Sequence, residues 1–234
     1  VYAKKGFKLQ NMMKGHKGIV YSLSKMESRE VTYSAITNFG NDFVAEDEDE
    51  DLGCNMILSA SSDGTIKQWN TDKYICLNTF EGHKGGVWKV LMTEEGFIVS
   101  ASGDHTIRMW TEEGNNTHTL EGHTDGVVSL VELKNGNLAS GSWDNTIRFW
   151  DMDSYKCLED HTINNVHCHL GESMFYLKED DILLVGGKGN IYIIDILEYK
   201  VIRTVTNGLN GYAISSISRL LNGSFIVGTS SNQC

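Results

Sequence analysis

The chain has 234 residues, of which 40% are hydrophobic and 22% charged, and its formal net charge is −11. This length allows one domain with a sizeable core, and no apolar run approaches the roughly 18 residues of a membrane-spanning helix. The acidic balance argues against a nucleic-acid-binding protein, which needs a basic face. Five scattered cysteines and the lack of an apolar leader favour a reducing compartment. We therefore expect a cytoplasmic protein, with the nucleus left open.

The turns of this chain must be made without proline, which is absent, whereas glycine occurs 24 times. Gly, Asn and Asp are the residues of tight β-hairpins. Apolar and small residues alternate in short runs bounded by such turns, which predicts strands. One example runs through residues 127–133, 137–142, 146–151 and 155–158. Four antiparallel strands in about 40 residues make one blade of a stacked repeat.

Three segments align without gaps and predict the same set of strands at residues 56–69, 97–110 and 137–150. Each segment contains a Ser-x-Ser-x-Asp turn and ends on a tryptophan, and these tryptophans lie 41 and 40 residues apart (positions 69, 110 and 150). A Gly-His pair precedes each segment, with its histidine at position 16, 83 or 123. A self-similar period of this length indicates a repeat architecture.

These marks resemble the WD-repeat family. The closing Trp-Asp is intact at Trp150-Asp151, and Trp69-Asn70 and Trp110-Thr111 are near variants. The resemblance implies an all-β fold, a β-propeller of four-stranded antiparallel blades. Seven blades, usual in this family, would need about 280 residues. We therefore expect an incomplete portion of a seven-bladed ring.

The repeat divides the single propeller domain, residues 1–234, into blades. A fourth copy is degenerate, because Ile194 replaces the tryptophan and Lys188 stands where the turn aspartate is expected. The expected units are the outer strand of a preceding blade at 1–14, a blade at 15–81 with an acidic insertion at 26–55, blades at 82–121 and 122–160, the degenerate blade at 161–206 and a partial blade at 207–234.

The resemblance implies a hydrogen-bonded chain of histidine, serine, aspartate and tryptophan inside each regular blade. Buried indole, hydroxyl and imidazole groups each need partners. The residues that match are His16, Ser59, Asp63 and Trp69, then His83, Ser100, Asp104 and Trp110, then His123, Ser140, Asp144 and Trp150. Because the set recurs three times at blade spacing, we interpret it as structural and not as a catalytic triad. We expect no enzyme, no catalytic residue and no cofactor.

The family binds peptides and proteins on the face that carries the Gly-His loops. Counting along the repeat places six residues there: Ile19, Tyr21, Ser62, Trp88, Val128 and Trp143. The aromatic ones should concentrate binding energy, and they suit a basic side chain through cation–π contact. For Trp88, packing against the neighbouring blade is an equally open interpretation. Trp143 stands in a turn, which favours exposure.

The acidic insertion contains six contiguous carboxylates: Glu46, Asp47, Glu48, Asp49, Glu50 and Asp51. Such a run repels itself and is usually a solvated loop. The alternative is a tether that attracts a basic partner segment.

The sequence therefore predicts a scaffold or adaptor that binds protein or peptide partners, with basic segments as one option and with neither nucleic acid nor membrane. One alternative is the substrate-recognition module of a larger protein such as a ubiquitin ligase. Another is a propeller enzyme or metal site at His161, His167 and His169. No ligand spacing supports that metal site, so we expect no metal.

Overall fold

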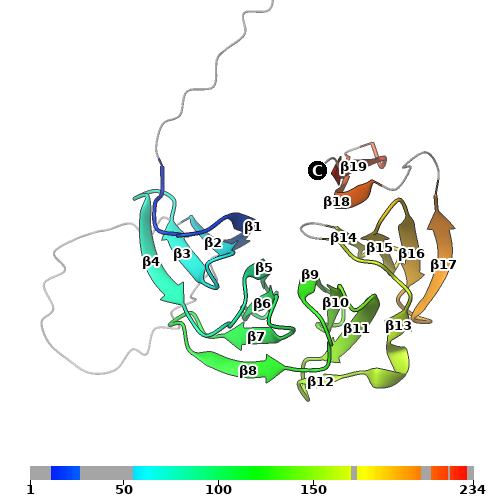
Figure 1. The fold of residues 1–234 in the computed structure, drawn as a ribbon, viewed down its shortest axis with the longest axis horizontal. Helices are drawn as coiled ribbons and strands as arrows, with labels where there is room; N and C mark the ends of the chain where they lie inside the picture. Colours follow the sequence, from blue (N-terminus) through cyan, green and yellow to red (C-terminus); the bar gives the residue numbers. More distant parts are fainter. Residues whose placement is uncertain (1–11, 27–54, 170–172, 207–211, 221, 231–234) are drawn as a thin grey trace, which may run out of the picture.

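The computed structural model describes residues 12–26, 55–169, 173–206, 212–220 and 222–230. These residues form five antiparallel sheets that follow one another along the chain. Figure 1 shows the sheets as blades around a common axis, in an arc that stays open between β1 (Val20–Met26) and the β18–β19 hairpin (Ala213–Arg219 and Phe225–Ser230). The architecture is an all-β propeller whose ring is not closed by the described residues.

Each blade is a meander in which consecutive strands pair, with the first strand nearest the axis. Blade one adds to β1 the strands β2 (Met56–Ser61), β3 (Ile66–Asn70) and β4 (Ile75–Phe80). Blade two contains β5 (Val87–Met92), β6 (Ile98–Ser102), β7 (Ile107–Trp110) and β8 (Asn116–Leu120). Blade three contains β9 (Val127–Glu132), β10 (Leu138–Ser142), β11 (Thr146–Asp151), β12 (Lys156–Cys157) and β13 (Ile163–Asn164), with the 3-10 helix η1 (Glu159–His161). Blade four contains β14 (Met174–Leu177), β15 (Ile182–Gly186), β16 (Ile191–Asp195) and β17 (Lys200–Val205), and β18–β19 is the half-blade five.

The turn between the second and third strands needs a left-handed residue directly after its aspartate. Gly64, His105 and Asn145 occupy this position with φ of 82°, 72° and 65°. Glycine adopts this region freely, and Asn and His are enriched among the other residues found there. The aspartate stabilises the turn, since the Oδ1 of Asp63 accepts the backbone N–H of Thr65 at 3.0 Å.

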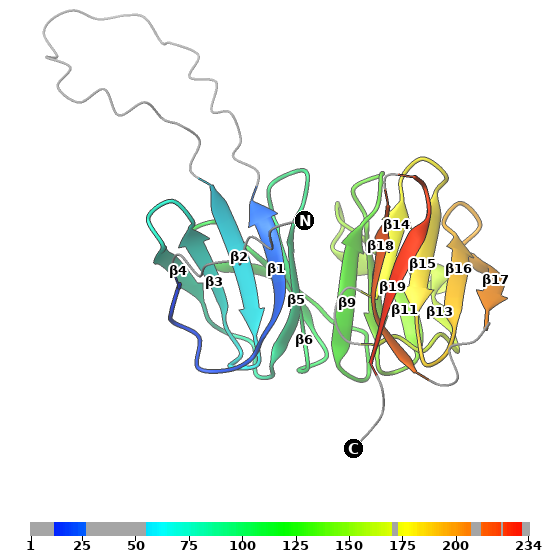
Figure 2. The ribbon, with the colours of Figure 1, turned by 90° about the horizontal axis from the view of Figure 1, so that it is seen from above.

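The core lies between blades, because the facing sides of consecutive sheets pack against each other. One apolar cluster joins each consecutive pair of blades. Between blades one and two, for example, Leu58 and Ile66 pack with Val90 and Ile98, all without exposed surface. The strands thus run side by side along the axis, as the turned view in Figure 2 shows.

The structure moves the expected boundary between blade three and the degenerate blade, which the sequence placed between residues 160 and 161. Residues 163–164 pair with Thr146 and Ile147 of β11, so they belong to blade three, and the first strand of the degenerate blade is β14. The η1 turn interrupts the outer edge of blade three and lets the chain pair twice with β11. The predicted strand at residues 1–14 and the insertion at 26–55, with its carboxylates Glu46–Asp51, lie largely outside the described residues.

Within the part of the chain that the structure describes, no helix has both the length and the apolar character needed to cross a membrane.

Candidate protein-interaction surface

A four-residue hydrogen-bond chain crosses blade one from its core to its loop. The indole Nε1 of Trp69 donates to Ser59 Oγ at 2.7 Å, and His16 Nε2 lies 2.7 Å from the same oxygen. His16 Nδ1 lies 2.9 Å from Asp63 Oδ2. The backbone N–H of Lys17 donates to that carboxylate at 2.7 Å. The chain therefore fixes the Gly-His loop against the turn that follows β2.

Blades two and three contain the same chain with nearly the same distances. His83 lies 2.8 Å from both Asp104 and Ser100, and Trp110 donates to Ser100 at 2.8 Å. In blade three the distances are 2.8 Å for His123 to Asp144, 2.7 Å for His123 to Ser140 and 2.8 Å for Trp150 to Ser140. In blade four the tryptophan position holds Ile194, which is fully buried and carries no donor.

The electrostatics of the chain in blade three favour an ionised Asp144 beside a neutral His123. Burial opposes ionisation of Asp144, but hydrogen bonds from His123, Thr146 and the Thr124 backbone outweigh it and hold its pKa well below the ordinary value. Asp63 and Asp104 show the same balance and the same direction. Burial lowers the pKa of His123, and the neighbouring Asp144 only partly opposes this. In blade three we therefore assign His123 Nδ1–H as the donor to the Asp144 carboxylate and His123 Nε2 as the acceptor from the Ser140 hydroxyl.

At the same end of the blades, three aromatic side chains from three blades form a continuous row. Tyr21 meets Trp88 edge to face with ring centroids 4.5 Å apart, and Trp88 meets Trp143 at 5.7 Å. Tyr21 and Trp88 sit where the pairing register of β1 and β5 shifts, so a bulge turns them out of the ladder. We call Tyr21, Trp88 and Trp143 the aromatic row.

Two glycines leave the space in which the aromatic row lies. A Cβ on Gly103 would come within 3.1 Å of Trp88 Nε1, and one on Gly126 within 3.1 Å of Trp143 Cε3. Trp88 is half-buried, packs against the core between blades three and four, and its buried Nε1 has no hydrogen-bond partner among the described residues. Trp143 is 40% exposed. Trp88 is therefore partly packed against the core and partly exposed on the surface. Trp143, at the end of the aromatic row, is exposed to solvent.

The other three predicted surface residues behave differently from one another. Ile19 is 65% exposed, and its backbone N–H donates to the hydroxyl of the exposed Ser62 at 2.8 Å. The prediction for Val128 is wrong, because Val128 has no exposed surface and belongs to the core between blades three and four. It occupies the bulge position of β9, but its short side chain lies in the cluster against which Trp88 packs.

The histidines considered for a metal site do not converge. His161 packs edge to face on Tyr199 at 4.0 Å, and His167 Nδ1 bonds to Asn145 Oδ1. Among the described residues, no group of three or more His, Cys, Asp or Glu side chains is arranged to hold a metal ion.

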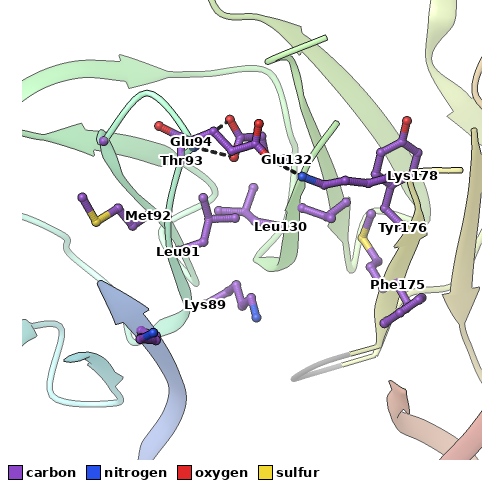
Figure 3. Close-up of a pocket in the computed structure, with 14 residues that line it drawn as sticks. Lys89, Leu91, Met92, Thr93, Glu94, Leu130, Glu132, Phe175, Tyr176 and Lys178 are labelled. Atoms are coloured by element: carbon purple, nitrogen blue, oxygen red, sulfur yellow. Dashed lines mark hydrogen bonds and ion pairs between the residues drawn. The ribbon is translucent and has the colours of Figure 1, made fainter. Parts of the chain in front are cut away.

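A hollow of about 590 Å³ at the opposite end of the inner strands was not predicted. Figure 3 shows its polar rim, where Lys178 pairs with Glu94 and the backbone N–H of Glu94 donates to Glu132. Its wall is apolar and includes Leu91, Leu130, Met174 and Phe175. Lys89, another lining residue, stands at the repeat position that is Ser22 in blade one and Ser129 in blade three. The lysine at a repeat position that otherwise holds serine is the signal by which the sequence could have indicated this hollow.

Comparison with known proteins agrees with the geometry. The sequence model of the family described as "WD domain, G-beta repeat" matches residues 48–70, 74–111 and 114–151. These matches include every strand from β2 to β11, and β1, β12 and β13 lie outside them. Blades one to three therefore contain three repeats of the WD-repeat family.

The similar curated proteins are much longer than the matched segments. Nuclear distribution protein PAC1-2 of Uncinocarpus reesii is 38% identical over 64 residues, which are 27% of this chain and 14% of that protein. Telomerase protein component 1 of Rattus norvegicus is 40% identical over 60 residues, 26% of this chain and 2% of that protein. The p21-activated protein kinase-interacting protein 1-like of Xenopus laevis is 39% identical over 62 residues, 26% of this chain and 17% of that protein. The similarity therefore concerns the repeat and not a whole protein.

Proposed function

We propose that this chain is a protein-interaction scaffold that binds a peptide or protein partner on the aromatic row. The observation that carries the proposal is the meeting of Tyr21, Trp88 and Trp143, from three different blades, at one end of the axis. Aromatic side chains dominate the binding energy of protein interfaces. The hydrogen-bond chains hold the loops under the row rigid, so little loop ordering opposes binding.

A basic side chain is the partner chemistry that this surface fits best. The faces of aromatic rings attract ammonium and guanidinium groups. Asp125 directly precedes Gly126, over which Trp143 lies, and its carboxylate is 55% exposed. The net charge of −11 adds a long-range attraction for a basic segment.

The relatives support an interaction role of this general kind. The Xenopus laevis relative is named for interaction with a p21-activated protein kinase. Cys76, Cys157 and Cys168 are free thiols, which suits action inside the cell. Binding, and not catalysis, is what the proposal assigns to this chain.

Partner capture from cell extract tests the proposal with a substitution that the repeat itself tolerates. Trp143→Ser installs the residue that blade one carries at the same position, Ser62. Leu197→Ala is the matched control, since Leu197 is 75% exposed and lies on blade four after β16. We expect specific proteins to bind the parent and the control and to be lost from Trp143→Ser at equal melting temperature. The same proteins on all three would contradict the proposal.

A further inference from the structure

Blades one to five have the same residue at one position of their inner segments, with a single exception. In blades one, two, three and five this position pairs with a small residue of the second strand: Ala60, Ala101, Gly141 and Gly228. In blade four its carbonyl accepts the backbone N–H of Gly186. From blade one to blade five the residues are Ser22, Lys89, Ser129, Ser173 and Ser216. Ser22, Ser129 and Ser173 are at most 4% exposed, so the repeat does not require a lysine in blade two.

Lys89 lines the hollow of about 590 Å³ at the end of the inner strands opposite the aromatic row. Figure 3 shows it across Leu91 and Leu130 from the pair of Lys178 and Glu94. A lysine can lay its apolar stem along such a wall and keep its ammonium group toward water. Neighbouring blades bound the hollow, since β5 contacts β1 and β9, and β9 contacts β14. Lys89 therefore adds a cation to a site that four blades form together.

The charge of the hollow is opposite in sign to the net charge of the chain. Its charged lining residues are three lysines and two glutamates: Lys25, Lys89, Lys178, Glu94 and Glu132. Glu94 pairs with Lys178, and Glu132 accepts the backbone N–H of Glu94, so both carboxylates are engaged. Lys25 is exposed and makes no ion pair with the described residues. The lining thus carries a net charge of +1 in a chain of −11, which favours a carboxylate as ligand.

The wall between these charges fits a large apolar side chain. It includes Leu91, Leu130, Met174 and Phe175. Methionine side chains adapt their shape to the group that they contact. The volume of about 590 Å³ lies within the range of about 300–1,000 Å³ that is typical of binding sites. A ligand that uses the whole hollow therefore places a carboxylate beside an apolar group.

We propose that the hollow binds an acidic segment of a partner protein, in which a carboxylate side chain stands next to a large apolar one. The carboxylate lies against Lys25 and Lys89, and the apolar side chain lies against Leu130 and Met174. Its charge is opposite to that of the basic segment which the aromatic row fits, so one chain can hold two partners at the two ends of its inner strands. The inference does not rest on the aromatic row, since the hollow contains none of its residues.

Selection from a random peptide library tests the proposal without a known partner. Peptides are selected on the parent chain and depleted on Lys89→Met, which removes the charge and keeps the length of the side chain. We expect the remaining peptides to share an Asp or Glu directly beside a Leu, Ile, Met or Phe. A set without such a pair, or a library in which no peptide distinguishes the two proteins, would overturn the proposal.

The affinity of one selected peptide, labelled with fluorescein, then assigns the site. Fluorescence anisotropy should show a Kd at least about tenfold higher for Lys89→Met than for the parent at equal melting temperature, because a charge-assisted contact is lost. Lys89→Arg keeps the charge and should retain most of the affinity. Lys73→Met, which makes the same change at an exposed position between β3 and β4, and Trp143→Ser should bind as the parent does. An equal Kd for Lys89→Met and the parent, or a Kd raised by Trp143→Ser, would overturn the proposal.

Two measurements test other occupants of the hollow. A variant in which the six carboxylates of Glu46–Asp51 are replaced by amides should bind the peptide within about threefold of the parent at physiological salt. Binding at least about tenfold tighter would overturn the proposal, because this acidic run would then compete for the hollow. A parent chain that sediments as a dimer and becomes monomeric with Lys89→Met would also overturn it, in favour of a second copy.

Discussion

At the residue scale, a serine hydroxyl connects the two halves of each hydrogen-bond chain. Ser140 Oγ accepts the indole N–H of Trp150 at 2.8 Å and lies 2.7 Å from His123 Nε2, and Ser140 itself has no exposed surface. Water cannot replace a hydroxyl at such a site without a cavity to hold it. The contribution of the hydrogen-bond chain to the free energy of unfolding should therefore appear when one member is removed and its buried partners are left unpaired.

We predict that Ser140→Ala lowers the free energy of unfolding by about 1–3 kcal/mol, the cost of one unsatisfied buried polar group. Urea unfolding measures the change. Ser154→Ala is the control, because its exposed hydroxyl donates to Asp151 at 2.8 Å and the variant should change stability by less than about 0.5 kcal/mol. Equal stability of Ser140→Ala and the parent would show that the hydrogen-bond chain of blade three does not stabilise the fold.

The same residues predict how stability depends on pH. The pKa of His123 is lowered in the folded chain, so the folded state binds fewer protons than the unfolded state as the pH falls below about 6.5. Stability is therefore fully present above that pH and declines below it. The lowered pKa values of Asp63, Asp104 and Asp144 add a further loss below about pH 4.

Urea unfolding at pH 7.5, 6.5, 5.5 and 5.0 tests the histidine contribution. We expect the free energy of unfolding to fall over this range, and to fall less steeply in a His123→Asn variant. Stability that rises as the pH drops from 7.5 to 5.0 would mean that His123 is protonated in the folded chain.

How far the sequence predicts this site also depends on single residues. The twelve members of the hydrogen-bond chains could be identified because they match the motif of the WD-repeat family, and the resemblance implies such a chain in each regular blade. Val128 could not be placed correctly by the same counting. Its backbone lies at the bulge, as do those of Tyr21 and Trp88, but a valine is too short to pass the tryptophan that packs over its cluster. Side-chain length and the neighbouring blade decide its exposure.

At the element scale, the second strand of blade three, β10, has a smaller residue where the segment after β13 packs against it. Ala60 and Ala101 stand at one position in blades one and two, and blade three has Gly141 there. A Cβ on Gly141 would lie 2.4 Å from the sulfur of the buried Cys168. The glycine is thus required by what packs on β10 and not by its backbone angles.

We predict that Gly141→Ala destabilises the chain by about 1–3 kcal/mol, because it overpacks the core between blades three and four. The double variant Gly141→Ala/Cys168→Ala should recover part of that loss, since it removes the nearest atom. Chemical unfolding of both variants measures the coupling. Additive losses would contradict the assigned contact.

The sequence could not predict that β13 pairs with β11, because a two-residue strand has no hydrophobic periodicity. Ile163 and Asn164 pair with β11 only after η1 reverses the chain. Strands of five or six residues with turn residues on both sides, such as β6 and β10, could be predicted from the alternation of apolar and small residues.

At the scale of the whole molecule, the two ends of the inner strands differ in how they could be predicted. The aromatic row follows from one repeat position in each of two blades and a turn position in a third. The hollow at the other end depends on residues from four blades, among them Lys25, Lys89, Glu132 and Lys178. No single repeat shows that these side chains meet, so it emerges only from the assembled arc.

Hydrogen–deuterium exchange of the chain with and without a captured partner tests the central claim most directly. If the partner docks on the aromatic row, the amides of residues 15–21, 82–88, 122–128 and 141–145 should exchange more slowly in the complex. Residues 92–96 and 174–178, at the other end of the inner strands, should keep their exchange rates. Slowed exchange at residues 92–96 and 174–178, with none at the aromatic row, would contradict the account.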